Sequence, residues 1–142
     1  MPVYTIRFDR LAKAIERGVN ESVKAIAIAV DQAVVSSTRV DTGRARSNWL
    51  VSLGKSNKKS IDPYHPGSGG STEAANEAAA LAQAQGVIDS RKLGQSIHIT
   101  NSVPYIGKLD SWDGMLSLGM QAGMVASRTI VPAIIKRELR RS

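Results

Sequence analysis

Apolar residues recur at helical spacing along the first part of the chain. They fall on one face at i, i+3 and i+4 intervals, and they comprise Leu11, Ala14, Ile15, Val19, Val23, Ile26, Ala29, Val30, Ala33 and Val34. Most charged side chains, Asp31 among them, lie off this face. The pattern predicts an amphipathic helix from about Arg10 to Ser37, ~40 Å long at 1.5 Å per residue, with Asp9 as its N-cap. The stripe is alanine-rich and lacks steady heptads, so we expect it to pack on a sheet or a neighbouring subunit rather than in a coiled coil.

Shorter runs alternate between apolar and polar residues, which is the spacing of strands. Near the N-terminus, the alternation from Tyr4 to Phe8 predicts a short strand or an extended arm. Two further alternating runs predict strands with one buried face, one beginning near Trp49 and one over residues 95–101. The residues expected in the core of these strands are Trp49, Val51, Leu53, Ile97 and Ile99.

Two more helices are indicated later in the chain. An alanine-rich segment predicts a helix from Glu73 to Gln85, with Gly86 as its stop. Helical spacing returns from Met124 to Arg141, where Pro132 predicts a kink or a new first turn. Between strand and helix, the prolines and glycines of residues 55–71 predict a long flexible loop, made basic by Lys55, Lys58 and Lys59. The length of 142 residues favours a single domain over residues 1–142.

Composition narrows the function classes. The net charge of +7 favours acidic partners such as nucleic acid or negatively charged protein surfaces. The absence of cysteine excludes disulfides and thiolate chemistry. No run of the sequence was expected to reach the ~20 apolar residues of a membrane span. His65 and His98 lack metal-ligand spacing, so neither a metal nor any other cofactor is expected.

Two short motifs resemble catalytic loops but lack the partners that catalysis needs. Asp41-Thr42-Gly43 resembles the triplet of aspartic proteases, which requires two such loops or a dimer. The glycine-rich stretch 67–70 lacks the lysine and hydroxyl residue of a phosphate loop. Since no nucleophile, base and oxyanion site assemble, the sequence predicts a protein that is not an enzyme.

Three motifs occur in a fixed order along the chain. The first is Val40-Asp41-Thr42-Gly43-Arg44-Ala45-Arg46-Ser47-Asn48-Trp49, in which turn residues precede two arginines and a tryptophan. The second runs from Ile99 to Asp110 and contains the pair Pro104-Tyr105. The third is Gln121-Ala122-Gly123-Met124-Val125. Together they resemble the neck, or tail-completion, proteins of long-tailed bacteriophages, which include head-tail joining and minor tail Z-like proteins. Ser111-Trp112 and a missing proline in the third motif depart from the family pattern.

The resemblance implies an α+β fold, in which a small, mainly antiparallel sheet is packed by a long N-terminal helix and a C-terminal helix. It also implies a homo-oligomeric ring, hexamer or dodecamer, that joins the head connector or adaptor to the tail tube or tail terminator. Such a protein would be assembled in the bacterial cytoplasm and reside in the virion, with its channel in non-specific contact with genome DNA. The residues expected to contact other subunits or partners are Asp41, Thr42, Gly43, Arg44, Arg46, Lys55, Lys58, Lys59, Tyr105, Met115, Met120 and Met124.

Two alternatives remain open at this point. A tail-terminator ring has similar size and topology. A basic nucleic-acid-binding module could track phosphate groups with Arg39, Arg44, Arg46, Lys55, Lys58 and Lys59. The second alternative lacks the interleaved aromatic residues of base-stacking proteins.

Overall fold

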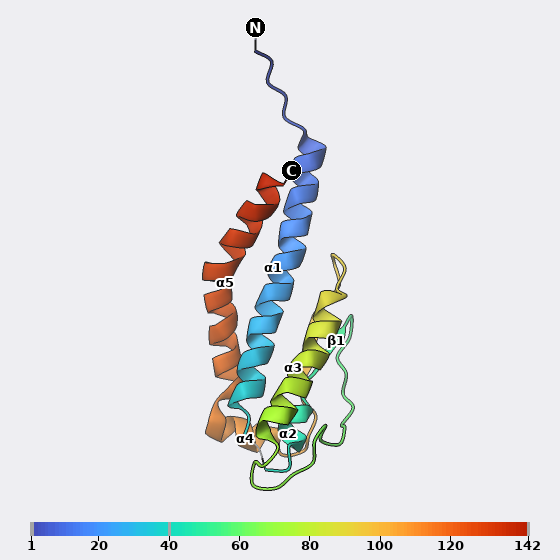
Figure 1. Ribbon diagram of the computed structural model, residues 1–142, viewed down its shortest axis with the longest axis vertical. Coiled ribbons are helices and arrows are strands. Elements are labelled where there is room, and N and C mark those ends of the chain that lie inside the picture. The colour runs from blue at the N-terminus through green and yellow to red at the C-terminus, as the bar shows by residue number, and fades with distance from the viewer. Residues whose placement is uncertain (1, 40, 142) are drawn as a thin grey trace.

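Two long antiparallel helices form the axis of the molecule. The computed structural model describes residues 2–39 and 41–141. Helix α1 spans Phe8–Ser37 and helix α5 spans Met115–Arg140, and the two lie side by side (Figure 1). The first of these is the helix that the apolar periodicity predicted. Its N-cap is Arg7 rather than Asp9, and the carboxylate of Asp9 instead pairs with the Arg7 guanidinium at 2.9 Å.

Glycines bring α1 and α5 close together. A Cβ atom on Gly119 would lie 2.8 Å from a methyl group of Val34, and one on Gly123 would lie 2.9 Å from a methyl group of Val30. Any side chain at these two positions would push the helices apart. The glycines therefore belong inside α5, which begins nine residues before the Met124 start that the sequence predicted.

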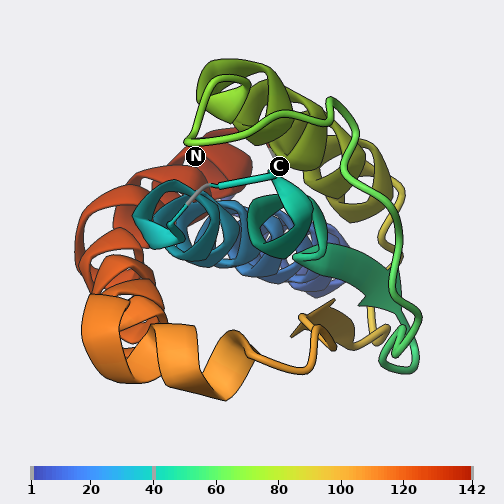
Figure 2. The ribbon, with the colours of Figure 1, turned by 90° about the horizontal axis from the view of Figure 1, so that it is seen from below.

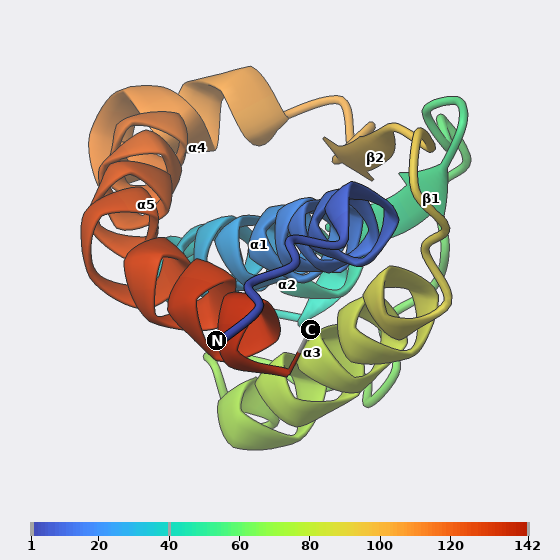
Figure 3. The same cartoon turned by 90° about the horizontal axis from the view of Figure 1, so that it is seen from above.

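A third helix and a small sheet cover other sides of α1. Helix α3 spans Glu73–Asp89, strand β1 spans Leu50–Leu53 and strand β2 spans Ile97–Thr100. The strands pair antiparallel, with Val51 opposite Ile99. Seen along the long axis, α1 is central and α3, α5 and the strands surround it (Figure 3). The predicted α+β class, with long N-terminal and C-terminal helices and an antiparallel sheet, is confirmed.

The sheet edge at β1 is completed by a side chain. The amide of Gln83 on α3 accepts a hydrogen bond from Val51 N at 3.2 Å and donates one to Val51 O at 3.0 Å. It thus satisfies the two backbone groups that a third strand would otherwise bind. Helix α3 continues through Gly86, so the predicted stop there is wrong. The helix extends to Asp89, and in this last part Ile88 packs in the core beside Val51.

The predicted core residues divide into two groups. Trp49 and Val51 are buried, as expected, at the centre of two apolar clusters between the sheet, α1 and α3. Leu53, Ile97 and Ile99 are only half-buried, which corrects the prediction that they are core. The sheet has two strands and lies at the edge of the molecule, so the ends of its strands are covered incompletely. Leu50, placed on the polar face by the alternation, is buried as well.

Two short helices close the end of the molecule where α1 ends and α5 begins. Helix α2 spans Arg44–Ser47 within the first motif, and helix α4 spans Ile106–Asp113 after the second. Figure 2 shows both at this end, together with the long loop between β1 and α3. The first motif therefore lies where three helix ends and a loop converge. Val40, its first residue, lies outside the described residues.

Candidate subunit-contact site

The turn of the first motif anchors the far half of the long loop. The carboxylate of Asp41 accepts a hydrogen bond from Gly69 N at 2.7 Å. The backbone carbonyls of Asp41 and Thr42 accept hydrogen bonds from Gly70 N and Gly67 N at 3.1 and 3.2 Å. These bonds tie residues 67–70 to the motif within one subunit. Asp41 and Thr42, which the sequence predicted as partner contacts, thus have a defined role inside the chain.

Two buried side chains after the turn hold the middle of the same loop. Asn48 accepts a hydrogen bond from Ile61 N at 2.7 Å and donates one to Ile61 O at 2.8 Å. Ser47 accepts one from Tyr64 N at 3.2 Å and donates to the side chain of Asn76 on α3 at 2.9 Å. From residue 61 onward the loop is therefore held by its own subunit. The flexibility of residues 55–71 stays a prediction, and it applies best to the exposed Lys55, Lys58 and Lys59.

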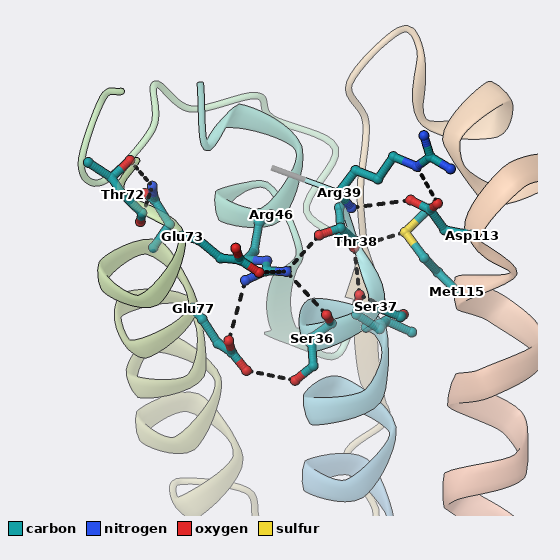
Figure 4. Close-up of polar contacts among 12 residues, drawn as sticks. Ser36, Ser37, Thr38, Arg39, Arg46, Thr72, Glu73, Glu77, Asp113 and Met115 are labelled. Atoms are coloured by element: carbon teal, nitrogen blue, oxygen red, sulfur yellow. Dashed lines mark hydrogen bonds and ion pairs between the residues drawn. The ribbon is translucent and has the colours of Figure 1, made fainter. Parts of the chain in front are cut away.

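Arg46 joins the C-terminal end of α1 to the N-terminal end of α3. Its guanidinium donates hydrogen bonds to the carbonyls of Thr38 at 2.7 Å and Ser36 at 3.1 Å. It also forms ion pairs with Glu73 and Glu77, each at 3.3 Å (Figure 4). The residue is only 2% exposed. Arg46 therefore acts inside the subunit, which corrects its assignment as a partner contact.

Thr38 connects Trp49 and Met115. Its hydroxyl donates to the carbonyl of Val34 at 2.6 Å and accepts from the indole N–H of Trp49 at 2.7 Å. The sulfur of Met115, the first residue of α5, lies 2.8 Å from the same hydroxyl. Met115 is fully buried, so its assignment as a contact residue is also wrong. The sequence placed it before the predicted start of the last helix, whereas it is the first residue of α5 and packs against α1.

Arg44 and Tyr105 remain exposed and line one open pocket. The pocket measures about 440 Å³ and is lined by Arg39, Asp41, Thr42, Gly43, Arg44, Ala45, Tyr105 and Leu109. The structure thus brings together residues of the first and second motifs, which are separated by about sixty positions in the sequence. Arg44 donates to the Ser60 hydroxyl at 3.3 Å and is otherwise directed to solvent. Of the predicted contacts, this group is the one that the tertiary structure gathers.

An exposed tryptophan lies beside the pocket. The cationic groups of Arg39 and Lys108 lie 5.2 and 5.1 Å from the ring centroid of Trp112, within cation–π range. Arg39 is held there by the carboxylate of Asp113 at 2.5 Å (Figure 4). Tryptophan, tyrosine and arginine are the residues that most often dominate protein interfaces. Trp112 was not among the contact residues predicted from the sequence, where it stands only as a departure from the family pattern.

Gly43 fits a position that no other residue tolerates. Its φ is +90°, and a Cβ there would lie 2.2 Å from the side-chain nitrogen of Asn76. We expect Gly43→Ala to lower the free energy of unfolding by about 2–4 kcal/mol, from backbone strain and disruption of the Asn76 hydrogen bonds. Gly54→Ala is the control, since Gly54 has φ +81° but nothing within 4 Å of its Cβ position. Urea unfolding measures both, and equal losses would contradict the proposed role of Asn76.

Helix α5 is apolar enough, by length and composition, to cross a membrane. Its most apolar 18-residue window has a mean hydropathy of 1.3 and only 17% of that window is buried. This corrects the expectation that no run approaches such a composition, because the helix predicted from the sequence began only at Met124, whereas α5 begins at Met115. The helix packs on α1 along one side and leaves Met120 and Met124, two predicted contacts, exposed. Within residues 2–39 and 41–141, no group of three His, Cys, Asp or Glu could hold a metal ion.

In comparisons with known proteins, no protein-family model, no curated protein and no solved structure matches this chain.

Proposed function

We propose that this chain is a structural subunit of a bacteriophage neck, which assembles into a ring joining the head connector to the tail tube. The observation that carries the proposal is the uncovered apolar surface of α5. Leu116, Met120 and Met124 extend along one flank of the helix, and Leu118 and Val125 extend along the other. Met120 is 70% exposed and Val125 is 57% exposed. A helix that is apolar on nearly all sides is stable in water only when other surfaces cover it.

The second support is a different surface with a different composition. The pocket of Arg44 and Tyr105, with Trp112 beside it, is lined by charged and aromatic side chains, and none of its lining residues belongs to α5. A ring needs heterologous interfaces, in which each subunit presents two different patches. This molecule presents two such patches, and the motif resemblance supplies the class of assembly. A tail-terminator ring is the close variant, and it is distinguished by whether purified rings bind tail tubes or head connectors.

We expect Met120→Glu with Met124→Glu to abolish ring formation while leaving the subunit folded. Each change places a charge on a surface that the ring would bury, and an unpaired buried charge opposes association strongly. Light scattering after size-exclusion chromatography gives the oligomer mass, negative-stain images show the ring, and circular dichroism reports folding. The matched control is Ser117→Glu with Gln121→Glu, which adds the same charge on the polar line of the same helix.

Three outcomes would contradict the assembly proposal. The wild-type protein could remain monomeric at all concentrations and with purified connector or tail tube. The Met120 and Met124 variant could assemble as the wild type does. The wild-type protein could partition into lipid vesicles through α5, which would make lipid, rather than other subunits, the cover of that helix.

One observation weakens the alternative that this chain binds nucleic acid, and another supports it. Arg46 is buried and cannot bind phosphate groups, which weakens the patch that the sequence indicated. At the other end of the molecule, however, Arg10, Lys13, Arg17 and Arg141 line a pocket of about 240 Å³. Arg17 also holds the pKa of Glu138 below its usual range through a hydrogen bond at 3.1 Å. Binding of duplex DNA that weakens steeply with salt would favour this alternative, and a ring with this end in its lumen would combine both functions.

A further inference from the structure

We propose that the N-terminal arm of one subunit, residues 2–8, occupies the groove between α1 and α5 of a neighbouring copy. This inference rests on the proposed self-assembly and names the contact that would join adjacent subunits.

The arm is apolar and has no cover of its own. Val3, Tyr4, Ile6 and Phe8 are 69–89% exposed. Residues 2–7 form no helix or strand, and Figure 1 shows the arm extending beyond the helices, away from the rest of the molecule. Solvated tails are rich in charged and polar residues, whereas residues 2–6 carry no charge at all. A segment of this composition is suited to an apolar surface.

The groove between α1 and α5 supplies such a surface. It measures about 460 Å³, and its lining is formed by Ala29, Gln32, Ala33, Ser36, Ala122, Val125, Ala126, Thr129 and Ile130. None of these side chains is charged, and alanines on both helices leave room for rings such as those of Tyr4 and Phe8. The amide of Gln32 can donate to and accept from the backbone of an extended segment. The hydroxyls of Ser36 and Thr129 donate within the subunit, to Glu77 and to the carbonyl of Val125, and can still accept a hydrogen bond. Arm and groove therefore match in polarity and in the bulk of their side chains.

The arm cannot reach the groove of its own subunit. The groove begins at Ala29, roughly 31 Å along α1 from Phe8 at 1.5 Å per residue. Residues 2–7 span at most ~21 Å when fully extended. Moreover, the arm leaves α1 at the end opposite to the groove (Figure 1). A second copy must therefore supply the groove. Because arm and groove are different surfaces, the contact can repeat head-to-tail from copy to copy, as the proposed ring requires.

Engineered cysteines test the contact directly, because the natural chain has none. Tyr4→Cys in one copy and Val125→Cys in a second copy, mixed and mildly oxidised, are expected to give a disulfide-linked dimer of the two variants. Two exposed or half-exposed sites away from the groove serve as controls, Ser111→Cys on α4 and His98→Cys on β2. Equal linkage to Ser111→Cys, stronger linkage to His98→Cys, or no linkage would overturn the proposal. Linkage to β2 would place the arm on the sheet edge.

Deletion of residues 2–6, which keeps the N-cap Arg7 and its ion pair with Asp9, provides the second test. The side chains of this segment are all exposed, so the deletion is expected to leave the thermal melting of the subunit unchanged. It is also expected to raise the protein concentration at half-assembly at least tenfold. Rings that form normally without the arm would overturn this inference and leave the proposed function intact, whereas a monomeric full-length chain would contradict the proposed function itself. Loss of vesicle binding, with unchanged association, would show that the arm is a lipid anchor and would also overturn the inference.

Discussion

Arg46→Ala is expected to lower the free energy of unfolding by about 2–4 kcal/mol, mainly because two carbonyls at the end of α1 lose their charged donor. The ion pairs add less, because the carboxylates of Glu73 and Glu77 are partly exposed to water. The guanidinium binds the final carbonyls of α1, through Ser36 and Thr38, and the acidic first turns of α3. Its charge is favourable at both places because the C-terminus of a helix is the negative end of its dipole and the α3 partners are carboxylates. Without the Arg46 guanidinium, the carbonyls of Ser36 and Thr38 and the carboxylate of Glu77 lose the donor that they share.

Two further variants make this measurement specific to Arg46. Arg44→Ala, two positions earlier, is expected to change stability by less than about 0.5 kcal/mol, as exposed substitutions usually do. Arg46→Lys keeps the charge but lacks the planar fork that contacts two helices at once, so an intermediate loss is expected. Urea unfolding, monitored by circular dichroism, measures all three. Equal losses for the Arg44 and Arg46 variants would contradict an intramolecular role for Arg46.

Asp31→Asn is expected to stabilise the protein above pH 7 and to have little effect near pH 4. Asp31 is 1% exposed, and neither carboxylate oxygen has a hydrogen-bond partner within the described part of the chain. Burial raises the pKa of this carboxyl from 3.8 to about 7. The folded protein thus binds this proton more tightly than the unfolded chain does, and stability falls as pH rises from about 4 to about 7. At 1.36 kcal/mol per pKa unit, the full loss is roughly 4 kcal/mol.

The substitution removes the charge while keeping the shape of the side chain. At pH 8, the Asp31→Asn protein should therefore exceed the wild type by up to roughly 4 kcal/mol in the free energy of unfolding. Asp62→Asn, in the exposed part of the loop, is the control for removing a surface carboxylate. Urea unfolding at pH 5 and pH 8 decides the question. A wild-type stability that is constant over this range would show that Asp31 has a partner or is solvated.

Asp31 shows why some residues that the sequence predicted to lie at the surface are buried in the structure. By helical periodicity it lies on the polar face of α1, and that assignment is correct for α1 alone. Helix α3 packs against the same side, with Leu81 and Ala84 beside Asp31 in the structure. Asp31 is buried because a second helix packs against it, and the periodicity of α1 alone cannot predict that contact. Burial by a neighbouring element also accounts for Met115, which α1 covers through Thr38 and Val34.

Local chemistry determined several features of the protein. The periodicity from Leu11 to Val34 was sufficient for α1, because its apolar stripe repeats for more than six turns. Alternation was sufficient to locate both strands, and Asp41-Thr42-Gly43 was sufficient for a turn, since φ at Gly43 is positive as turn chemistry requires. The exposed state of Arg44, Met120 and Met124 also agrees with their assignment to surfaces that partners could reach.

Only the tertiary structure decided where the breaker residues and polar groups belong. Gly119 and Gly123 disfavour a helix in isolation, yet they lie within α5 because close contact with Val30 and Val34 compensates for their low propensity. From the sequence Arg46 was predicted to lie at the surface, but in the structure the ends of α1 and α3 surround it. In each case the residues that pack against these positions are distant in sequence. The free energy of that packing outweighs the local conformational preference of the residues involved.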